Sequence, residues 1–130
     1  MGNFLSERVR QVRAAFPGWA VEALLVTNLA NCRWLSGFTG SSATLLITSD
    51  RAILATDSRY WEQAVTQAPE FELYQSRRTL QDTAELITSA SVTTIGFEAS
   101  HVTVQQAQEL QRIAGVSWQP LNHPLEPMRM

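Results

Sequence analysis

The sequence predicts an α/β fold with a mixed sheet that contains a central β-hairpin. Two apolar runs, residues 43–47 and 52–55, flank Thr48-Ser49-Asp50-Arg51, whose composition is typical of a turn between paired strands. Patterns of strand and helix type alternate through the second half of the chain, which favours helices layered on a sheet. Because the strands of a hairpin are antiparallel, the sheet is expected to be mixed rather than purely parallel.

The chain is expected to begin with an amphipathic helix over residues 6–16. Val9 and Val12 fall at helical spacing there, and arginines occupy the other side. Pro17-Gly18 is expected to end this helix. The apolar run at 23–27 has the length and composition of a short buried strand.

A loop over residues 28–40, with at most one helical turn at 31–36, is expected to connect this strand to the hairpin. After the hairpin, Asp57 or Ser58 can cap a helix by accepting a hydrogen bond from an unpaired helical amide. That helix is predicted over residues 58–68, before a proline that ends it.

Further strands and helices are predicted to alternate from residue 71 onward. Pro120 confines the last strand to a sheet edge or a strand end, because proline has no N–H to donate. The proline-rich tail at 122–130 has no core pattern and is interpreted as the start of a linker, which leaves residues 1–121 as the domain. The predicted strands cover residues 71–75, 93–97 and 116–121, and the predicted helices cover residues 79–89 and 103–113.

Length and composition are typical of one globular domain. The chain has 130 residues, 45% of them hydrophobic and 17% charged, and no apolar run approaches the roughly 20 residues of a membrane span. Residues 1–20 lack the apolar core of a secretory signal, so a cytoplasmic location is expected. The net charge of −2 and the scattered arginines favour neither nucleic acid nor a membrane as a partner.

Residues that carry enzyme chemistry are few and isolated. His101 and His123 lack a second ligand at helical or hairpin spacing, and the single cysteine, Cys32, lacks a local base and is interpreted as a small buried hydrophobe. The glycine-rich loop at 37–42 precedes a strand, whereas a phosphate-cradling loop precedes a helix. We expect no catalytic residue and no metal ligand in this chain.

Two acidic residues have a more specific interpretation. Asp57 and Arg59 are spaced to form an ion pair at a helix start, and a capping role is favoured there over a catalytic one. Glu98 follows a predicted strand, at an edge of the sheet where ligands commonly bind. No partner for Glu98 can be named from the sequence.

Two ordered motifs carry a resemblance to a known family. Residues 31–42 read NCRWLSGFTGSS, residues 55–60 read ATDSRY, and the hairpin lies between them. These motifs resemble the amino-terminal domain of the creatinase, prolidase and Xaa-Pro aminopeptidase family. Many relatives have glycine at the positions of Ala43 and Ser58, and the side chain of Ser58 favours a helix cap there over a left-handed turn.

The resemblance implies a three-layer α/β/α domain with a topology like that of ribonuclease H. It also implies a parent hydrolase, a metallopeptidase of aminopeptidase P or prolidase (Xaa-Pro dipeptidase) type. Two divalent ions, manganese, cobalt or zinc, would then lie in a carboxyl-terminal pita-bread domain, and this fragment, without metal or cofactor, would be catalytically silent. The implied partners are that catalytic domain, further copies in a homo-oligomer, and short Xaa-Pro peptides bound through the parent.

In such relatives the amino-terminal domain supports oligomer assembly and shapes access to the active site. Arg33 could meet a substrate carboxylate as a fork donor and Phe38 could form an apolar wall; equally, the motif could serve only to shape the hairpin and pack the domain. A non-catalytic relative that binds peptides or proteins and a creatinase-like hydrolase remain open as parents. The candidate substrate- or partner-contact residues are Arg33, Phe38, Thr39, Asp57, Arg59 and Tyr60.

Overall fold

A computed structural model describes residues 4–76, 80–113 and 115–129. It contains a six-stranded sheet, five α-helices and two short 3-10 helices. The helices are α1 (Phe4–Trp19), α2 (Leu29–Ser36), α3 (Trp61–Gln67), α4 (Leu80–Ala90) and α5 (Val104–Gln111), with the 3-10 helices η1 (Ser58–Tyr60) and η2 (Glu126–Arg129). The strands are β1 (Ala23–Val26), β2 (Thr44–Thr48), β3 (Ala52–Thr56), β4 (Glu72–Gln75), β5 (Thr94–Glu98) and β6 (Ser117–Leu121).

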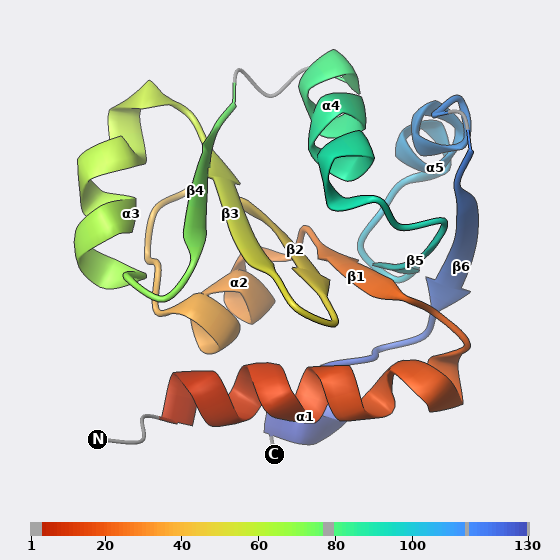
Figure 1. Ribbon diagram of the computed structural model, residues 1–130, viewed down its shortest axis with the longest axis horizontal. Coiled ribbons are helices and arrows are strands. Elements are labelled where there is room, and N and C mark those ends of the chain that lie inside the picture. Colours follow the sequence, from red (N-terminus) through yellow and green to blue (C-terminus); the bar gives the residue numbers. More distant parts are fainter. Residues whose placement is uncertain (1–3, 77–79, 114, 130) are drawn as a thin grey trace.

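The sheet is mixed and separates two helical layers. Its strand order is β4-β3-β2-β1-β5-β6, in which β2 is antiparallel to both neighbours and all other pairs are parallel. Helices α1, α2 and α3 cover one face, and α4 and α5 cover the other (Figure 1). The predicted three-layer architecture with a central hairpin is therefore confirmed.

The hairpin turn is held by side chains as well as by the strand ladder. The Thr48 hydroxyl accepts a hydrogen bond from the backbone N–H of Arg51 at 2.9 Å. Arg13 of α1 donates to the carbonyl oxygens of Thr48 and Arg51 at 2.7 and 3.1 Å. One arginine of the first helix thus ties that helix to the turn of the hairpin.

Alternation along the buried strands produces one core on each side of the sheet. Adjacent residues of β1, Leu24 and Leu25, are 0% and 2% exposed and belong to different cores. Leu24 packs in the core under α1 and α2, with Val12 and Leu35. Leu25 packs in the core under α4 and α5, with Ile87 among others.

Helix boundaries in the first half of the chain differ from the sequence prediction. Pro17-Gly18 does not end α1, which continues to Trp19, where the indole packs 6.3 Å from the Phe16 ring and so supports the last turn. Helix α2 spans 29–36, longer than the predicted single turn. The predicted helix at 58–68 is divided into η1 and α3.

Helix α5 is shorter than predicted, and an apolar residue of its first turn faces solvent. It ends at Gln111 rather than at residue 113, and Val104 is 76% exposed. A capping box between Thr103 and Gln106 fixes its first turn.

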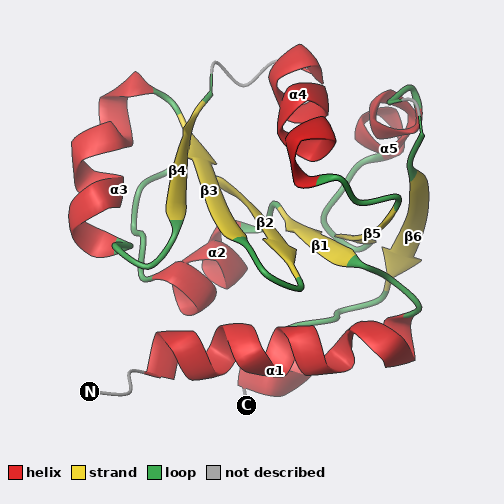
Figure 2. Cartoon of the chain, viewed as in Figure 1, coloured by secondary structure: helices red, strands yellow, loops and turns green. Residues whose placement is uncertain are grey.

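The tail after β6 packs on the α1 side of the sheet, which differs from the coreless linker that the sequence predicts. Leu125 is 0% exposed and packs in the same core as Val12 of α1, and in Figure 2 the last helical turn of the chain lies on the α1 side of the sheet. Arg129 donates to the side-chain oxygen of Asn31 in α2 at 2.9 Å. Within the described ranges, no helix is long and apolar enough to cross a lipid bilayer.

Candidate functional site

The loop between α2 and β2 is built on a buried phenylalanine. Gly37 ends α2 in the left-handed conformation at φ 83°. Phe38 is 1% exposed, and its ring meets the ring of Tyr60 edge-on with centroids 5.7 Å apart. A Cβ atom on Gly40 would lie 2.3 Å from the Phe38 ring, so only glycine fits there. The first motif therefore shapes this loop by packing.

Tyr60 links the loop to η1. Its hydroxyl shares a 2.5 Å hydrogen bond with the hydroxyl of Ser41. That bond is the main cause of a lowered pKa for Tyr60. The guanidinium of Arg59 lies 5.0 Å from the centroid of the Tyr60 ring, at cation–π distance. The second motif thus places a phenol between a hydroxyl and a cation.

Asp57 and Arg59 form the ion pair that their spacing predicts. The Arg59 Nε and Nη2 atoms each donate to one carboxylate oxygen of Asp57 at 2.9 Å. Asp57 also accepts from the backbone N–H of Arg59 at 3.1 Å, so the predicted capping role is confirmed. Hydrogen bonding from the Arg59 side chain holds the pKa of Asp57 well below its usual range and raises the pKa of Arg59.

Thr39 is fixed from α3 by two glutamine side chains. Its backbone N–H donates to Gln67 Oε1 at 2.9 Å, and its hydroxyl accepts from Gln63 and Gln67 at 3.1 and 3.0 Å. Thr39, Asp57, Arg59 and Tyr60 together form what we call the loop surface, on which Thr39 and Arg59 are exposed.

Arg33 stands apart from the loop surface. Its side chain is exposed on α2 and makes no hydrogen bond or ion pair within the part of the chain that the structure describes. The next residue, Trp34, is covered by the Arg8 guanidinium, 4.9 Å from the ring centroid. The structure thus brings five of the six candidate residues together, with Phe38 beneath the others as a core residue and Arg33 free to contact another molecule.

Glu98, for which the sequence names no partner, is the centre of a buried polar network. One carboxylate oxygen accepts from the backbone N–H groups of Thr27 and Asn28 at 2.7 and 2.9 Å. The other accepts from the side-chain amide of Asn31 at 2.5 Å. Asn31 in turn accepts from Arg129, so the network joins β5, α2 and η2. We call these contacts the Glu98 network.

The groups that supply nucleophiles and metal ligands stay dispersed. Cys32 is buried, and that burial raises the pKa of its thiol to about 12. Across residues 4–76, 80–113 and 115–129, no three histidine, cysteine, aspartate or glutamate side chains gather as a metal site would require. The residues that the structure describes therefore do not form the ligand set of a two-metal centre.

Comparison with known proteins agrees with this architecture. The family model described as Creatinase/Prolidase N-terminal domain matches residues 8–130. "Uncharacterized peptidase YqhT" of Bacillus subtilis is 34% identical over 97 residues, which is 74% of this chain but 28% of that protein. The chain therefore spans between a quarter and a third of that relative.

Two solved structures are similar over nearly the whole chain. A Xaa-Pro dipeptidase from Bacillus anthracis has a TM-score of 0.91 and 27% identity, and the match covers 96% of this chain and 36% of that one. The N-terminal domain of cytoplasmic peptidase PepQ from Mycobacterium tuberculosis H37Rv has a TM-score of 0.87 and 33% identity, with 95% and 98% covered.

Fold, site and comparisons define an α/β domain of the kind that precedes the catalytic part of Xaa-Pro peptidases. The chain belongs to the creatinase/prolidase N-terminal domain family. The expected resemblance is thereby confirmed, and with it the association with hydrolases that act as Xaa-Pro peptidases.

Proposed function

We propose that this chain is the non-catalytic amino-terminal domain of a cytoplasmic Xaa-Pro metallopeptidase, where it supports oligomer assembly and shapes access to the active site. Its catalytic partner would be a following domain that holds two divalent metal ions, manganese, cobalt or zinc. The observation that carries this proposal is the extent of the structural match, which covers 96% of this chain but only 36% of a Xaa-Pro dipeptidase. The dispersed acidic and histidine side chains of the described residues are consistent with it.

The loop surface and Arg33 are the parts of the domain that we assign to contacts. Phe38 and Gly40 hold the loop from beneath, so Thr39 and Arg59 are presented at the surface with little freedom to lose on binding. Arg33 presents a planar fork of donors, the geometry that suits a peptide carboxylate or an acidic side chain of a neighbouring subunit. In this assignment Phe38 supports the contact surface and does not itself touch the partner.

The proposal is tested by peptidase assays on two proteins side by side. One is this 130-residue chain, and the other is a protein that carries the same domain followed by its catalytic domain. With manganese, a Xaa-Pro dipeptide and a longer Xaa-Pro peptide, we expect cleavage only by the longer protein. Cleavage by the isolated chain would contradict the proposal. If neither protein cleaves the peptides, the result would favour a parent that is a non-catalytic binding relative or a creatinase-like hydrolase.

The contact role of Arg33 is tested in the longer protein with Arg33→Ala and a matched control, Arg112→Ala. Arg112 is also exposed but follows α5, on the opposite side of the sheet. We expect Arg33→Ala to raise the KM for a Xaa-Pro peptide by about tenfold or to shift the assembly to smaller species, because a charge-assisted contact is lost. Equal KM and equal mass in both variants would leave Arg33 without a contact role.

A further inference from the structure

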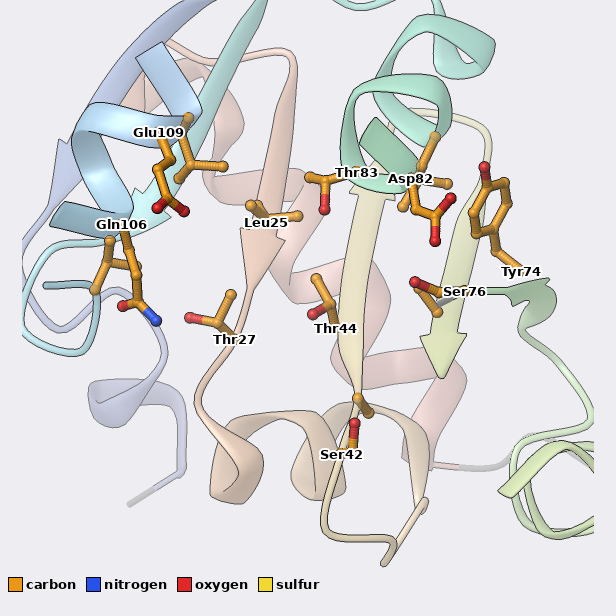
Figure 3. Close-up of a pocket in the computed structure, with 15 residues that line it drawn as sticks. Leu25, Thr27, Ser42, Thr44, Tyr74, Ser76, Asp82, Thr83, Gln106 and Glu109 are labelled. Atoms are coloured by element: carbon orange, nitrogen blue, oxygen red, sulfur yellow. The ribbon is translucent and has the colours of Figure 1, made fainter. Parts of the chain in front are cut away.

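The face of the sheet opposite α1 contains a cavity of about 250 Å³. It lies between α4 and α5, over the ends of the central strands, and Figure 3 shows polar side chains lining it from both helices and from the sheet. Thr27 follows the carboxyl end of β1, and Ser76 follows the carboxyl end of β4. Ligands of open α/β sheets bind at that edge. Ser42 and Ala43 of the loop between α2 and β2 also line the cavity, so it lies near the loop surface although it occupies the opposite face of the sheet.

Two polar groups of the cavity have no partner among the described residues. The Thr27 hydroxyl is buried and makes no hydrogen bond. The carboxylate of Glu109, partly buried on α5, takes part in no hydrogen bond or ion pair within the described ranges and points toward the sheet in Figure 3. A buried hydroxyl without a partner favours a ligand that supplies one, and the carboxylate of Glu109 offers that ligand a further acceptor.

The lining also has a definite charge and an apolar floor. Among the described residues that line the cavity, Asp82 and Glu109 are acidic and none is basic. Leu25, Leu86 and Leu110 supply apolar surface between them. An occupant that combines a hydrogen-bond-donating cation with a short apolar body fits this lining, because the two carboxylates would repel an anion.

We propose that the cavity between α4 and α5 binds a small primary ammonium compound, whose cationic head lies at Glu109 and Thr27 and whose apolar part lies on Leu25 and Leu110. A carboxylate and a hydroxyl oxygen are both acceptors for an ammonium group, which carries three donors and no acceptor. The inference goes beyond the proposed function and does not rest on it. It concerns a different face and needs no catalytic domain.

The test uses the 130-residue chain itself, because the PepQ domain shows that this unit forms on its own: the solved chain is matched over 98% of its length. The ¹⁵N-labelled chain is titrated with leucinamide, and with 4-methylpentanamide as a neutral compound of similar shape that lacks the ammonium group. We expect saturable shifts of amide signals around the cavity with leucinamide, with a Kd of about 1 mM. The neutral amide should bind at least roughly tenfold more weakly.

Two variants locate the site. Glu109→Gln keeps the shape of the side chain and removes its charge, so affinity for leucinamide should fall by about tenfold. Glu62→Gln removes the same charge from an exposed position on α3, the opposite layer, and should leave affinity unchanged. Thr27→Val is nearly isosteric, removes the unpartnered hydroxyl, and should weaken binding while leaving the melting temperature equal or higher.

Several outcomes would overturn the inference. These are an absence of saturable shifts with leucinamide, equal affinity for the neutral amide, and signals that move outside the cavity instead of around it. Equal loss of affinity in Glu109→Gln and Glu62→Gln would show a general charge effect and would also count against the site. Because the comparison of the two compounds uses the unaltered chain, it decides the matter even if a variant fails to fold.

Discussion

The two faces of the sheet are organised differently. The face under α1, α2 and α3 is packed around Phe38 and Leu35, joined to the hairpin by Arg13, and closed by the Glu98 network. The face under α4 and α5 has a smaller core and retains a cavity of about 250 Å³ with an unpartnered hydroxyl. The comparison teaches that the larger core and the Glu98 network lie on one face, while the cavity on the other face has a buried hydroxyl in its lining. A cavity of similar volume, about 260 Å³, also lies beside α1, so the two faces differ in core size and lining rather than in room.

The largest expected effect compares the adjacent leucines of β1. Leu24→Ala should lower the free energy of unfolding by about 4 kcal/mol, because a fully packed side chain leaves a void. Leu25→Ala should cost about 2.5 kcal/mol, because Leu25 already borders the cavity and loses fewer contacts. Urea unfolding of both variants measures the difference. Equal costs would show that the two faces are packed equally well.

A second effect concerns the polar part of the packed face. Glu98→Gln should lower the free energy of unfolding by about 3 kcal/mol, since both carboxylate oxygens accept hydrogen bonds and an amide nitrogen must face a donor in either orientation. Glu62→Gln is the matched control and should change stability by less than about 0.5 kcal/mol. A Glu98→Gln variant as stable as the control would mean that the Glu98 network contributes little.

A third effect separates two glycines. Gly40→Ala should cost about 2 kcal/mol, because the added methyl group would overlap the Phe38 ring and the loop must move. Gly18→Ala, in the last turns of α1 with no atom within 4 Å of the new methyl group, should be neutral or stabilising by up to about 1 kcal/mol. Thermal melts measure both variants. A melting temperature of Gly40→Ala equal to or above that of Gly18→Ala would show that the loop is loosely packed.

The smallest effect is the dependence of stability on pH at the edge of the packed face. The pKa of Asp57 is lowered in the folded chain by hydrogen bonds from Arg59. Its ion pair therefore adds stability above the unfolded pKa of about 3.9, and this stability is lost as the pH falls toward the lower folded pKa. Asp57→Asn keeps a capping side chain but not the charge. The melting temperatures of the two proteins should differ at neutral pH and converge in acid; a constant difference would exclude the ion pair as its cause.

Much of the fold follows from local patterns, and the departures follow from contacts between distant residues. The hairpin and the Asp57 cap depend on neighbours in the sequence, so their residues predict them. Asn28 and Gly37 are ordinary cap residues that could have indicated the full length of α2. In contrast, the last turn of α1 depends on packing by Trp19, which overrides the proline signal.

The candidate site was predictable to a similar degree. The motifs place Thr39, Arg59 and Tyr60 near one another through the hairpin, but nothing in them indicates that Phe38 lies beneath rather than beside them. The partners of Glu98 are about 70 residues away in the sequence and become neighbours only through the parallel pairing of β1 and β5. The cavity between α4 and α5 depends on helix placement, for which the sequence carries no local signal.

The buried thiol of Cys32 gives the domain an internal reporter of unfolding. Its side chain is 1% exposed, and burial raises its pKa to about 12, so at neutral pH neither access nor ionisation allows alkylation of the folded chain. Reaction with a thiol reagent must wait until α2 separates from the sheet. Because the sequence has one cysteine, every modified molecule records one such opening event, and the labelling rate measures how often the packed face comes apart.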